Sequence, residues 1–501
     1  MNELLFSMPI ATLALLVASH RTPRFKYKAL IKLSGYTVFS LFIALLYFLE
    51  RIDDFSLVLG ISFIPISLLV SLYTIPYMEK NKYPPRLEIA MDLFLSSIIF
   101  AYVAPSFLLM VIAWTAGEIV GYVLIRLGEE HSVEGSLTSS RGFIFTSTFT
   151  YEISVFTLIT LSIIFTTTSI GLSELMKPFT YPTSIAIIPA VIIPPLIVGF
   201  VTKTANIPLH FWLPSAHSSA PSPASATLSG LMVSLGYYGL YRLVNLIEVD
   251  PYRVYITWFF ILIGFLSILY GGLQALSERD VKKLLAYSTI ATNGFVSAVF
   301  GLYVLQPLTI NKWILAISIL MHAAYKTTLF CEAGLVEIAH GTRYIHGVRG
   351  FIRISPISSI GSIAAILSLL GVPGTIGFIA KILAIYSSIN AGEVDLLITT
   401  VSLLSILSYI IISALIGLKY IRIHYSDFSP KVEVLVSNLE REIQAPVLAL
   451  GLLNTLLSFI VLAIGAYIYS YIIALITPLS VLITYIAYTN LRVQSRVWEH
   501  G

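Results

Sequence analysis

Four ionisable side chains lie inside apolar stretches that are long enough to cross a membrane. They are Glu118, Lys203, Lys326 and Lys381. Placing a charge in hydrocarbon costs from about 2.5 to more than 10 kcal/mol, so such residues are rare and mark ion or proton pathways. The sequence therefore predicts a relay of ionisable groups within the membrane.

The relay residues divide into a pair and two later positions. Glu118 is expected to pair with Lys203, and moving the carboxylate away would release a proton from the lysine. His322 lies four residues before Lys326 on the same helical face, and neutral imidazole both donates and accepts a proton. Lys381 is the predicted site of release.

Other polar residues near these positions have less specific roles. His210 and His217 follow Lys203 and could admit protons. Glu152 is expected to be a buried carboxyl, with structural and relay roles both open. Glu332 and Glu337 follow Lys326, and either they form an access path for protons or they are interfacial charges.

Two of the apolar spans are interrupted close to a lysine. Pro208 follows Lys203 within span 184–214, and Pro373 precedes Lys381 within span 356–390. A proline inside a helix removes a backbone hydrogen bond, and lipid offers no substitute partner. Paired interruptions of this kind predict a transport site built from two repeats. Helix kinks without transport are the alternative.

The elements that must position these residues are transmembrane helices. Of the 501 residues, 57% are hydrophobic and 11% charged, and the mean hydropathy is +0.89. Apolar runs of about 20 residues predict an all-α integral membrane protein rather than a barrel. We predict fourteen or fifteen spans, near 3–19, 30–50, 55–77, 87–104, 106–126, 143–166, 184–214, 222–246, 254–276, 284–304, 313–338, 356–390, 396–418, 446–468 and 471–490.

The distribution of basic residues predicts the orientation. Most of the 30 lysines and arginines fall in alternate connecting segments, which places the N-terminus outside and the C-terminus in the cytoplasm. The predicted division is 1–84 for three N-terminal helices, 85–247 and 248–420 for two inverted five-helix repeats, and 421–501 for a cytoplasmic connector and the C-terminal helices.

Cofactor chemistry within the chain is not indicated. The single cysteine, Cys331, excludes a cysteine-ligated iron–sulfur cluster, and no nucleotide-binding motif is present. We therefore expect no cofactor site, no metal site and no redox centre here.

Four motifs, in order along residues 85–420, resemble those of a known family. They are KTANIPLHFWLPSAH (203–217) with APSPASA (220–226), DVKKLLAYSTI (280–290), HAAYKTTLF (322–330) and GVPGTIGFIAK (371–381). They resemble the antiporter-like membrane subunits of complex I, hydrogenase-4 and formate hydrogenlyase, and the first motif is most similar to the large membrane subunit of hydrogenase-4. Multisubunit sodium/proton antiporter subunits are close behind.

The resemblance implies a role as well as a fold. The chain would be a proton-translocating subunit in a prokaryotic plasma membrane, beside other antiporter-like and small hydrophobic subunits. Peripheral hydrogenase- or dehydrogenase-like partners would carry iron–sulfur centres and either nickel–iron, flavin or quinone. A subunit of a cation/proton antiporter and a structural paralogue that does not pump are the alternatives.

The same resemblance implies roles for particular residues and exposes one departure. Glu118 and Lys203 match the family's glutamate–lysine pair, and Lys326 and Lys381 match its later lysines. The family usually carries a lysine or histidine in the eighth span, where this chain has Ser229 and Ser234. The sequence leaves open whether His322 and Lys326 supply the central link and whether H⁺ or Na⁺ moves.

Overall fold

The chain is almost entirely helical in a computed structural model that describes residues 12–22, 24–131, 138–164, 190–247, 249–425 and 439–462. Those ranges contain no β-strand, and an isolated bridge joins Asp280 to Tyr344. Nine helices within them are long and apolar enough to cross a membrane. The all-α membrane fold is thereby confirmed. The predicted span 471–490 and most of span 3–19 lie outside the described residues.

The described helices follow the predicted spans closely. A short helix at 12–19 precedes α2, and a helix at Arg441–Leu462 follows α19. The others are α2 (Phe25–Phe48), α3 (Asp54–Lys80), α4 (Arg86–Val103), α5 (Phe107–His131), α6 (Thr138–Phe143), η1 (Ile144–Thr148), α7 (Phe149–Ile164), η3 (Ala190–Ile192), α9 (Ile193–Lys203), α10 (Trp212–Ser219), α11 (Ser222–Thr227), η4 (Leu228–Met232), α12 (Val233–Leu246), η5 (Asp250–Tyr252), α13 (Arg253–Ser277), α14 (Val281–Leu305), α15 (Thr309–His340), η6 (Ile345–Gly347), α16 (Phe351–Ile354), α17 (Pro356–Leu370), α18 (Ile376–Asn390), η7 (Ala391–Glu393) and α19 (Leu396–Tyr425).

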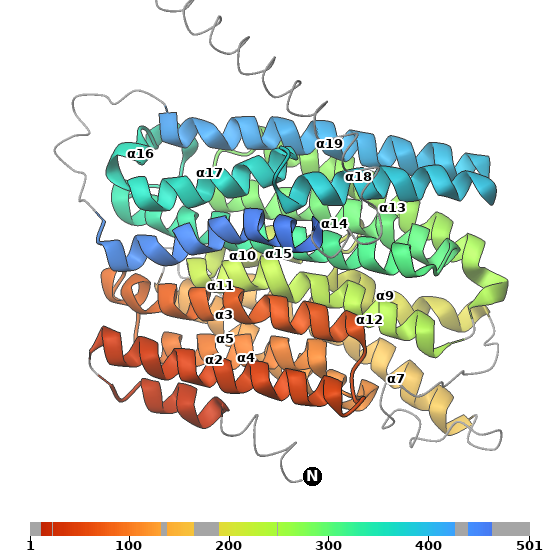
Figure 1. Cartoon of the computed structure of the whole chain (residues 1–501), viewed down its shortest axis with the longest axis horizontal. Coiled ribbons are helices and arrows are strands. Elements are labelled where there is room, and N and C mark those ends of the chain that lie inside the picture. The colour runs from red at the N-terminus through yellow and green to blue at the C-terminus, as the bar shows by residue number, and fades with distance from the viewer. Residues whose placement is uncertain are drawn as a thin grey trace, which may run out of the picture.

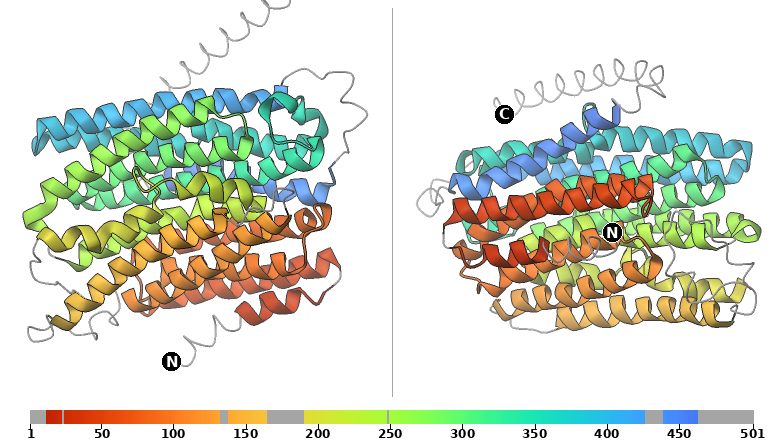
Figure 2. Two further views of the ribbon diagram at one scale, coloured as in Figure 1. Left: turned by 180° about the vertical axis from the view of Figure 1, so that it is seen from behind. Right: turned by 60° about the horizontal axis from the view of Figure 1, so that its bottom comes forward.

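The helices lie side by side in a broad bundle that follows chain order. In Figure 1, α2 lies near the lower edge, α14 and α15 lie in the middle, and α19 lies at the upper edge. The helix at 441–462 turns back across the bundle, as the right-hand view in Figure 2 also shows. The side-chain oxygen of Gln444, on that helix, accepts a hydrogen bond from the backbone of Ile357 at 3.2 Å, which fixes its position against α17.

The sequence marks the helix ends in the expected ways. Asp53, Asp280 and Thr375 precede α3, α14 and α18, and each side chain accepts a hydrogen bond from a free backbone N–H of the first turn. The helices α15 and α17 end at Gly341 and Gly371, which have φ values of 64° and 80°. Glycine adopts this left-handed conformation without the steric cost of a side chain.

Both predicted interruptions are present. The helix α9 ends at Lys203 and α10 begins at Trp212, so Pro208 lies in the first break. The helix α17 ends at Leu370 and α18 begins at Ile376, so Pro373 lies in the second. The inverted symmetry of two five-helix repeats remains a prediction.

The described residues contain two π-helical turns. The first, η1, interrupts the helix that runs from α6 to α7, and the second, η4, lies between α11 and α12. A π turn inserts one residue into a helix and so redirects the side chains on one face, and such turns are frequent at functional sites. Ser147 lies in η1 and Ser229 in η4.

The centre of the bundle is formed by α14 and α15. The apolar windows of both helices are completely buried. A pair of glycines brings α13 and α14 together, because a Cβ atom on Gly294 would lie 2.4 Å from the carbonyl oxygen of Gly264. Polar groups on α14 are therefore shielded from lipid and must find partners within the protein.

Candidate functional site

Glu118 and Lys203 form a closed, buried ion pair. Lys203 Nζ lies 2.6 Å from Glu118 Oε1, and both side chains are at most 1% exposed. Ser147 Oγ accepts a hydrogen bond from Lys203 at 2.6 Å and donates one to Glu118 at 2.8 Å. Trp114 Nε1 also donates to Glu118 Oε1, at 3.1 Å. The structure thus brings together the pair that the sequence predicts, and Ser147 is a partner that sequence reasoning missed.

The first break places Lys203 at the end of a helix rather than within one. Trp212 Nε1 donates to the carbonyl oxygen of Thr202 at 3.1 Å, which satisfies an acceptor at the end of α9. The ring centroids of Phe143 and Trp212 lie 4.9 and 5.7 Å from Lys203 Nζ. Aromatic faces attract a cation, so these two rings help to hold the ammonium group in its buried position.

The backbone groups freed by this break are bound from neighbouring helices. The amide of Ile207 donates to Ser267 Oγ of α13 at 3.0 Å. Asn293 of α14 donates through Nδ2 to the carbonyl oxygen of Thr204 at 2.5 Å. The break is therefore connected directly to the central helix.

Lys326 is held without a carboxylate. Its Nζ donates to the carbonyl oxygen of Leu285, at 2.8 Å, and to Ser288 Oγ, both on α14. Among the described residues, no acidic side chain lies within ion-pairing distance of Lys326, which is fully buried. An ammonium group in this position has neutral partners only.

Two histidines lie near Lys326. His322 and His217 are both fully buried, and both interact electrostatically with Lys326. None of their ring nitrogens has a hydrogen-bond partner within the part of the chain that the structure describes. The predicted proximity of His322 to Lys326 is present, and His217, from the broken seventh span, joins the same group.

Lys381 is fixed by the second break. Its Nζ donates to the carbonyl oxygen of Leu369 at 2.6 Å and to Ser413 Oγ at 2.8 Å. A Cβ atom on Gly371 would lie 3.1 Å from this Nζ, so the glycine leaves room for the ammonium group. Lys381, like Lys326, has neutral hydrogen-bond acceptors.

A row of polar side chains on α14 connects these sites. Asn293 binds the first break, Ser288 binds Lys326, and Thr289 Oγ1 lies 2.7 Å from Ser229 Oγ of η4. Thr289 and Asn293 are four positions apart and therefore share a face of the helix, with Ser288 beside them. Polar residues at this spacing in an apolar helix are the signal that sequence reasoning overlooked. The row passes beside the eighth span, where Ser229 has this partner and buried Ser234 Oγ has none among the described residues.

Three hydroxyl groups lie between Lys326 and Lys381. Thr292 Oγ1 lies 2.5 Å from the hydroxyl of Tyr325 and 3.2 Å from that of Tyr409. The tyrosine rings face the two lysines, with Lys326 Nζ 5.6 Å from the centroid of Tyr325 and Lys381 Nζ 5.4 Å from that of Tyr409. We call Thr292, Tyr325 and Tyr409 the hydroxyl triad.

The accessory residues are placed differently from one another. Glu152 is partly exposed, so the prediction of a buried carboxyl is wrong; it lies in the first turn of α7 and interacts electrostatically with Glu118. Glu332 is fully buried beside His424, with 3.4 Å between Glu332 Oε1 and His424 Nε2. The alternative that Glu332 is an interfacial charge is therefore wrong.

Glu337 is partly exposed and pairs with Lys282 at 3.3 Å. His210 lies in the first break against the ring of Tyr270.

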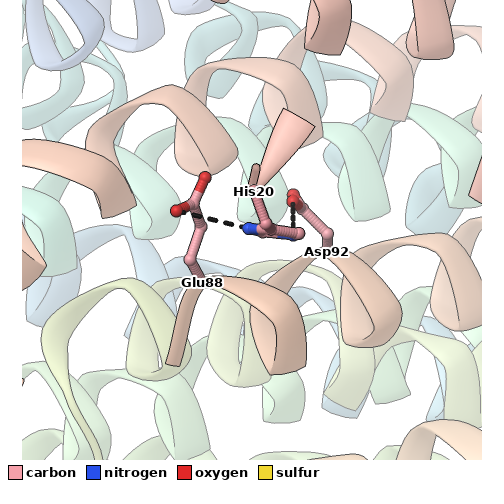
Figure 3. A group of neighbouring side chains, drawn as sticks. All are labelled: His20, Glu88 and Asp92. Carbon is pink, nitrogen blue, oxygen red and sulfur yellow. Dashed lines mark ion pairs between the residues drawn. The ribbon is translucent and has the colours of Figure 1, made fainter. Parts of the chain in front are cut away.

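A further charged cluster lies outside the predicted relay. His20 lies between two carboxylates of α4, with Nδ1 3.3 Å from Glu88 and Nε2 3.2 Å from Asp92, as Figure 3 shows. Lys28 Nζ lies 2.8 Å from Glu88, and Lys32 Nζ lies 2.5 Å from Asp92. A metal ion bound by His20, Glu88 and Asp92 would have to displace both ammonium groups, so we assign the cluster as an ion-pair network.

The protonation of His20 controls part of this network. Burial disfavours the charged imidazole, but its contacts with Asp92 and Glu88 outweigh burial and raise the pKa of His20 above its ordinary value. Both ring nitrogens face a carboxylate, and only the doubly protonated ring donates to both. The charged form therefore joins the segment 12–22 to α4.

This network predicts a pH dependence of stability. Because the folded-state pKa is raised, the contribution of His20 is complete below its unfolded pKa and disappears as pH rises through the folded pKa. We expect His20→Gln to lower the midpoint of thermal unfolding by about 2 °C near pH 6 and to have no effect near pH 9. Thermal unfolding of the detergent-solubilised chain checks this, and an equal effect at both values would contradict it.

Comparison with known proteins identifies the family. The family described as NADH:quinone oxidoreductase/Mrp antiporter, TM, matches residues 104–408, which is more than half of the chain. The chain belongs to this family. Its antiporter-like character, predicted from four motifs, is thereby confirmed, and the match contains Glu118, Lys203, Lys326 and Lys381.

Relatives of this chain include antiporter subunits and hydrogenase-4 components. A Staphylococcus haemolyticus chain named as antiporter subunit mnhA2 is 27% identical over 318 residues, which are 61% of this chain and 39% of that one. A Methylacidiphilum infernorum homologue of hydrogenase-4 component F is 32% identical over 162 residues, 32% of this chain and 33% of its own. This chain thus matches well under half the length of either relative.

One solved structure shows the same fold along nearly the whole chain. A chain in the structure of the Mrp complex from Dietzia sp. DQ12-45-1b matches with a TM-score of 0.72 and 16% identity, covering 95% of both chains. Because only 16% of the residues are identical, the match shows that the two chains share a fold and nothing more.

Proposed function

We propose that this chain is a proton-translocating subunit of a prokaryotic membrane oxidoreductase complex, in which partner subunits carry out the electron transfer. The observation that carries the proposal is the closed Glu118–Lys203 pair at a helix break, followed by two buried lysines that have no carboxylate partner among the described residues. Buried cations with only neutral partners are costly for stability, and such residues are retained where they move ions.

The proposed mechanism starts from the closed pair. A shift that moved Glu118 away from Lys203 would leave a buried ammonium group without its counter-charge and so favour release of its proton. The proton would then pass toward the second half of the chain along groups that both donate and accept protons. These groups are His217 and His322 near Lys326, and the hydroxyl triad between Lys326 and Lys381. The row on α14 supports continuity past the uncharged eighth span.

The hydroxyl triad is open to a conservative test. Tyr409→Phe removes one hydroxyl but keeps the ring, which stacks on Phe295 with centroids 4.6 Å apart. We expect proton transport to fall about tenfold, as the loss of one hydrogen bond in the path would imply, with no change in folding. Tyr303→Phe is the matched control, because that hydroxyl binds Asn245 away from the lysines. Equal rates in the two variants would remove the triad from the path.

A second candidate function is a subunit of a cation/proton antiporter without redox chemistry. The S. haemolyticus relative, which is named as an antiporter subunit, and the fold shared with a chain of the Mrp complex favour it. In this case the same buried residues would exchange protons against Na⁺ or another cation.

Purification from the native host distinguishes the two functions. The tagged chain would be isolated in mild detergent, its partner chains identified by mass spectrometry, and the complex reconstituted in vesicles containing a pH-sensitive dye. The oxidoreductase proposal predicts iron–sulfur partners and proton movement when a reductant is added. Small hydrophobic partners alone, with proton movement driven by a cation gradient, would establish the antiporter. Copurifying partner chains without proton movement under either condition would establish a structural paralogue.

A further inference from the structure

A basic pocket lies at the end of the bundle where α13 and α19 end and α14 begins, on the side of α16 in Figure 1. Its volume is about 430 Å³. Its polar lining consists of Ser277, Glu278, Arg279, His346, Arg349, Lys419 and Arg422. Four of these side chains are cationic at neutral pH and one is anionic, so the lining has a formal charge of +3. We call this site the basic pocket.

The charges of the basic pocket are not balanced by neighbours. Arg279, Arg349 and Arg422 are exposed, and none forms an ion pair within the ranges that the structure describes. The one acid, Glu278, is engaged by the backbone, since its Oε1 accepts hydrogen bonds from the amides of Arg279 and Asp280 at 2.8 and 3.1 Å. Three guanidinium groups around one cavity repel each other, and an anion bound among them would relieve that repulsion.

Lys419 gives the pocket a fixed wall. Its Nζ donates to the carbonyl oxygens of Ala275 and Leu276, at 3.1 and 2.8 Å, and so closes the end of α13. This joins α13 to α19 and sets the spacing between Arg279 and Arg422. The three arginines remain available, and guanidinium binds phosphate oxygens in a two-pronged geometry.

An apolar surface continues from the basic pocket toward the middle of the bundle. Leu273 lies one helical turn before Ser277 and is 64% exposed. Leu415 and Leu418 lie one turn before Lys419 and Arg422, and they are 46% and 48% exposed. A cationic pocket above an exposed apolar surface matches a molecule with an anionic phosphate head and hydrocarbon chains. A free anion would not use the apolar part.

We propose that the basic pocket binds the phosphate headgroup of an anionic phospholipid, whose acyl chains cover Leu273, Leu415 and Leu418. Arg279, Arg349 and Arg422 contact the phosphate. Basic side chains near the membrane surface attract anionic lipids by this electrostatic mechanism. The site is separate from the buried lysines and does not depend on the proposed transport function.

Lipid binding to the full chain tests this site. The chain would be delipidated in a neutral detergent, and its thermal unfolding and bound phosphorus measured after adding phosphatidylglycerol, phosphatidylcholine or inorganic phosphate. We expect phosphatidylglycerol to stabilise the wild type and to remain bound at about one molecule per chain. The triple variant Arg279→Gln/Arg349→Gln/Arg422→Gln should bind it about tenfold more weakly. Arg253→Gln is the matched control, because Arg253 begins α13 at the opposite end of that helix.

Each other outcome overturns the assignment. Equal retention of phosphatidylglycerol by the triple variant and the wild type would show that the arginines do not bind it. Equal protection by inorganic phosphate would identify a free anion as the ligand, and equal protection by phosphatidylcholine would show that the lipid charge is irrelevant. An acidic partner chain that copurifies with the wild type, is absent from the triple variant and prevents phosphatidylglycerol binding would make the pocket a protein interface. If the triple variant fails to fold, the three single variants are measured instead.

Discussion

Replacing Lys203 with methionine is expected to lower proton transport by about a hundredfold or more, the scale of losing a positioned proton-transfer group. It should also destabilise the chain by about 3 kcal/mol, because Glu118 would remain buried without its partner. Methionine matches the length of the lysine stem, so packing against Phe143 and Trp212 is kept. Transport would be measured with a pH-sensitive dye in vesicles containing the reconstituted complex, and stability by thermal unfolding.

A double variant separates the two effects of Lys203. In Glu118→Gln/Lys203→Met both charges are removed, and glutamine still accepts a hydrogen bond from Trp114. Stability should return to within about 1 kcal/mol of the wild type, because a buried ion pair contributes little net stability compared with neutral replacements. Transport should stay lost. Lys312→Met removes a lysine that contacts Trp313 outside the relay and should leave both quantities unchanged. Transport at the wild-type rate in the single variant would exclude Lys203 from the path.

The ionisable residues and the helix breaks could be predicted because each has a local signal. Lys203 and Lys381 are charged residues in apolar runs, and Pro208 and Pro373 mark the breaks beside them. These features depend only on the hydropathy and the backbone chemistry of a single span. Both can be read directly from the sequence of that span. The apolar runs of about 20 residues likewise predicted the membrane spans.

The partners of these residues could not be predicted, because pairing depends on how distant helices pack. Ser147 is an ordinary serine in sequence, and the π turn η1 brings it between Glu118 and Lys203. His424 follows a long apolar span, where a histidine resembles an interfacial residue, yet it lies buried against Glu332. His20 similarly occurs in a basic connecting segment, and its carboxylate partners are more than sixty residues away.

The uncharged eighth span shows what a residue-by-residue comparison misses. In the sequence, Ser229 and Ser234 interrupt the series of ionisable residues, because neither side chain can replace the lysine or histidine that is usual in the eighth span. In the structure the neighbouring helix α14 supplies polar groups to both halves, through Asn293 at the first break and Ser288 at Lys326. The proposed path would then follow the adjacent helix α14, without any charged residue in the eighth span.

Replacing Lys326 with methionine should separate function from stability more sharply than any change at Lys203. We expect transport to fall by about a hundredfold, as for Lys203. Stability should instead be unchanged or rise by about 1 kcal/mol, since within the described part of the chain the ammonium group of Lys326 is bound only by a carbonyl oxygen and Ser288, and its removal leaves no carboxylate there unpaired. The same vesicle and unfolding measurements apply to this variant.

The contrast between the two lysines is what makes this result decisive. A lysine kept for folding would destabilise the chain when it is removed, whereas a lysine kept for transport can be removed with a gain in stability and a loss of activity. Lys326→Arg keeps the charge but not the shape of the ammonium group, and it holds its proton at all relevant pH values, so it should also be inactive. If Lys326→Met destabilised the chain as strongly as Lys203→Met while transport continued, Lys326 would be a structural residue and the relay would have to bypass it.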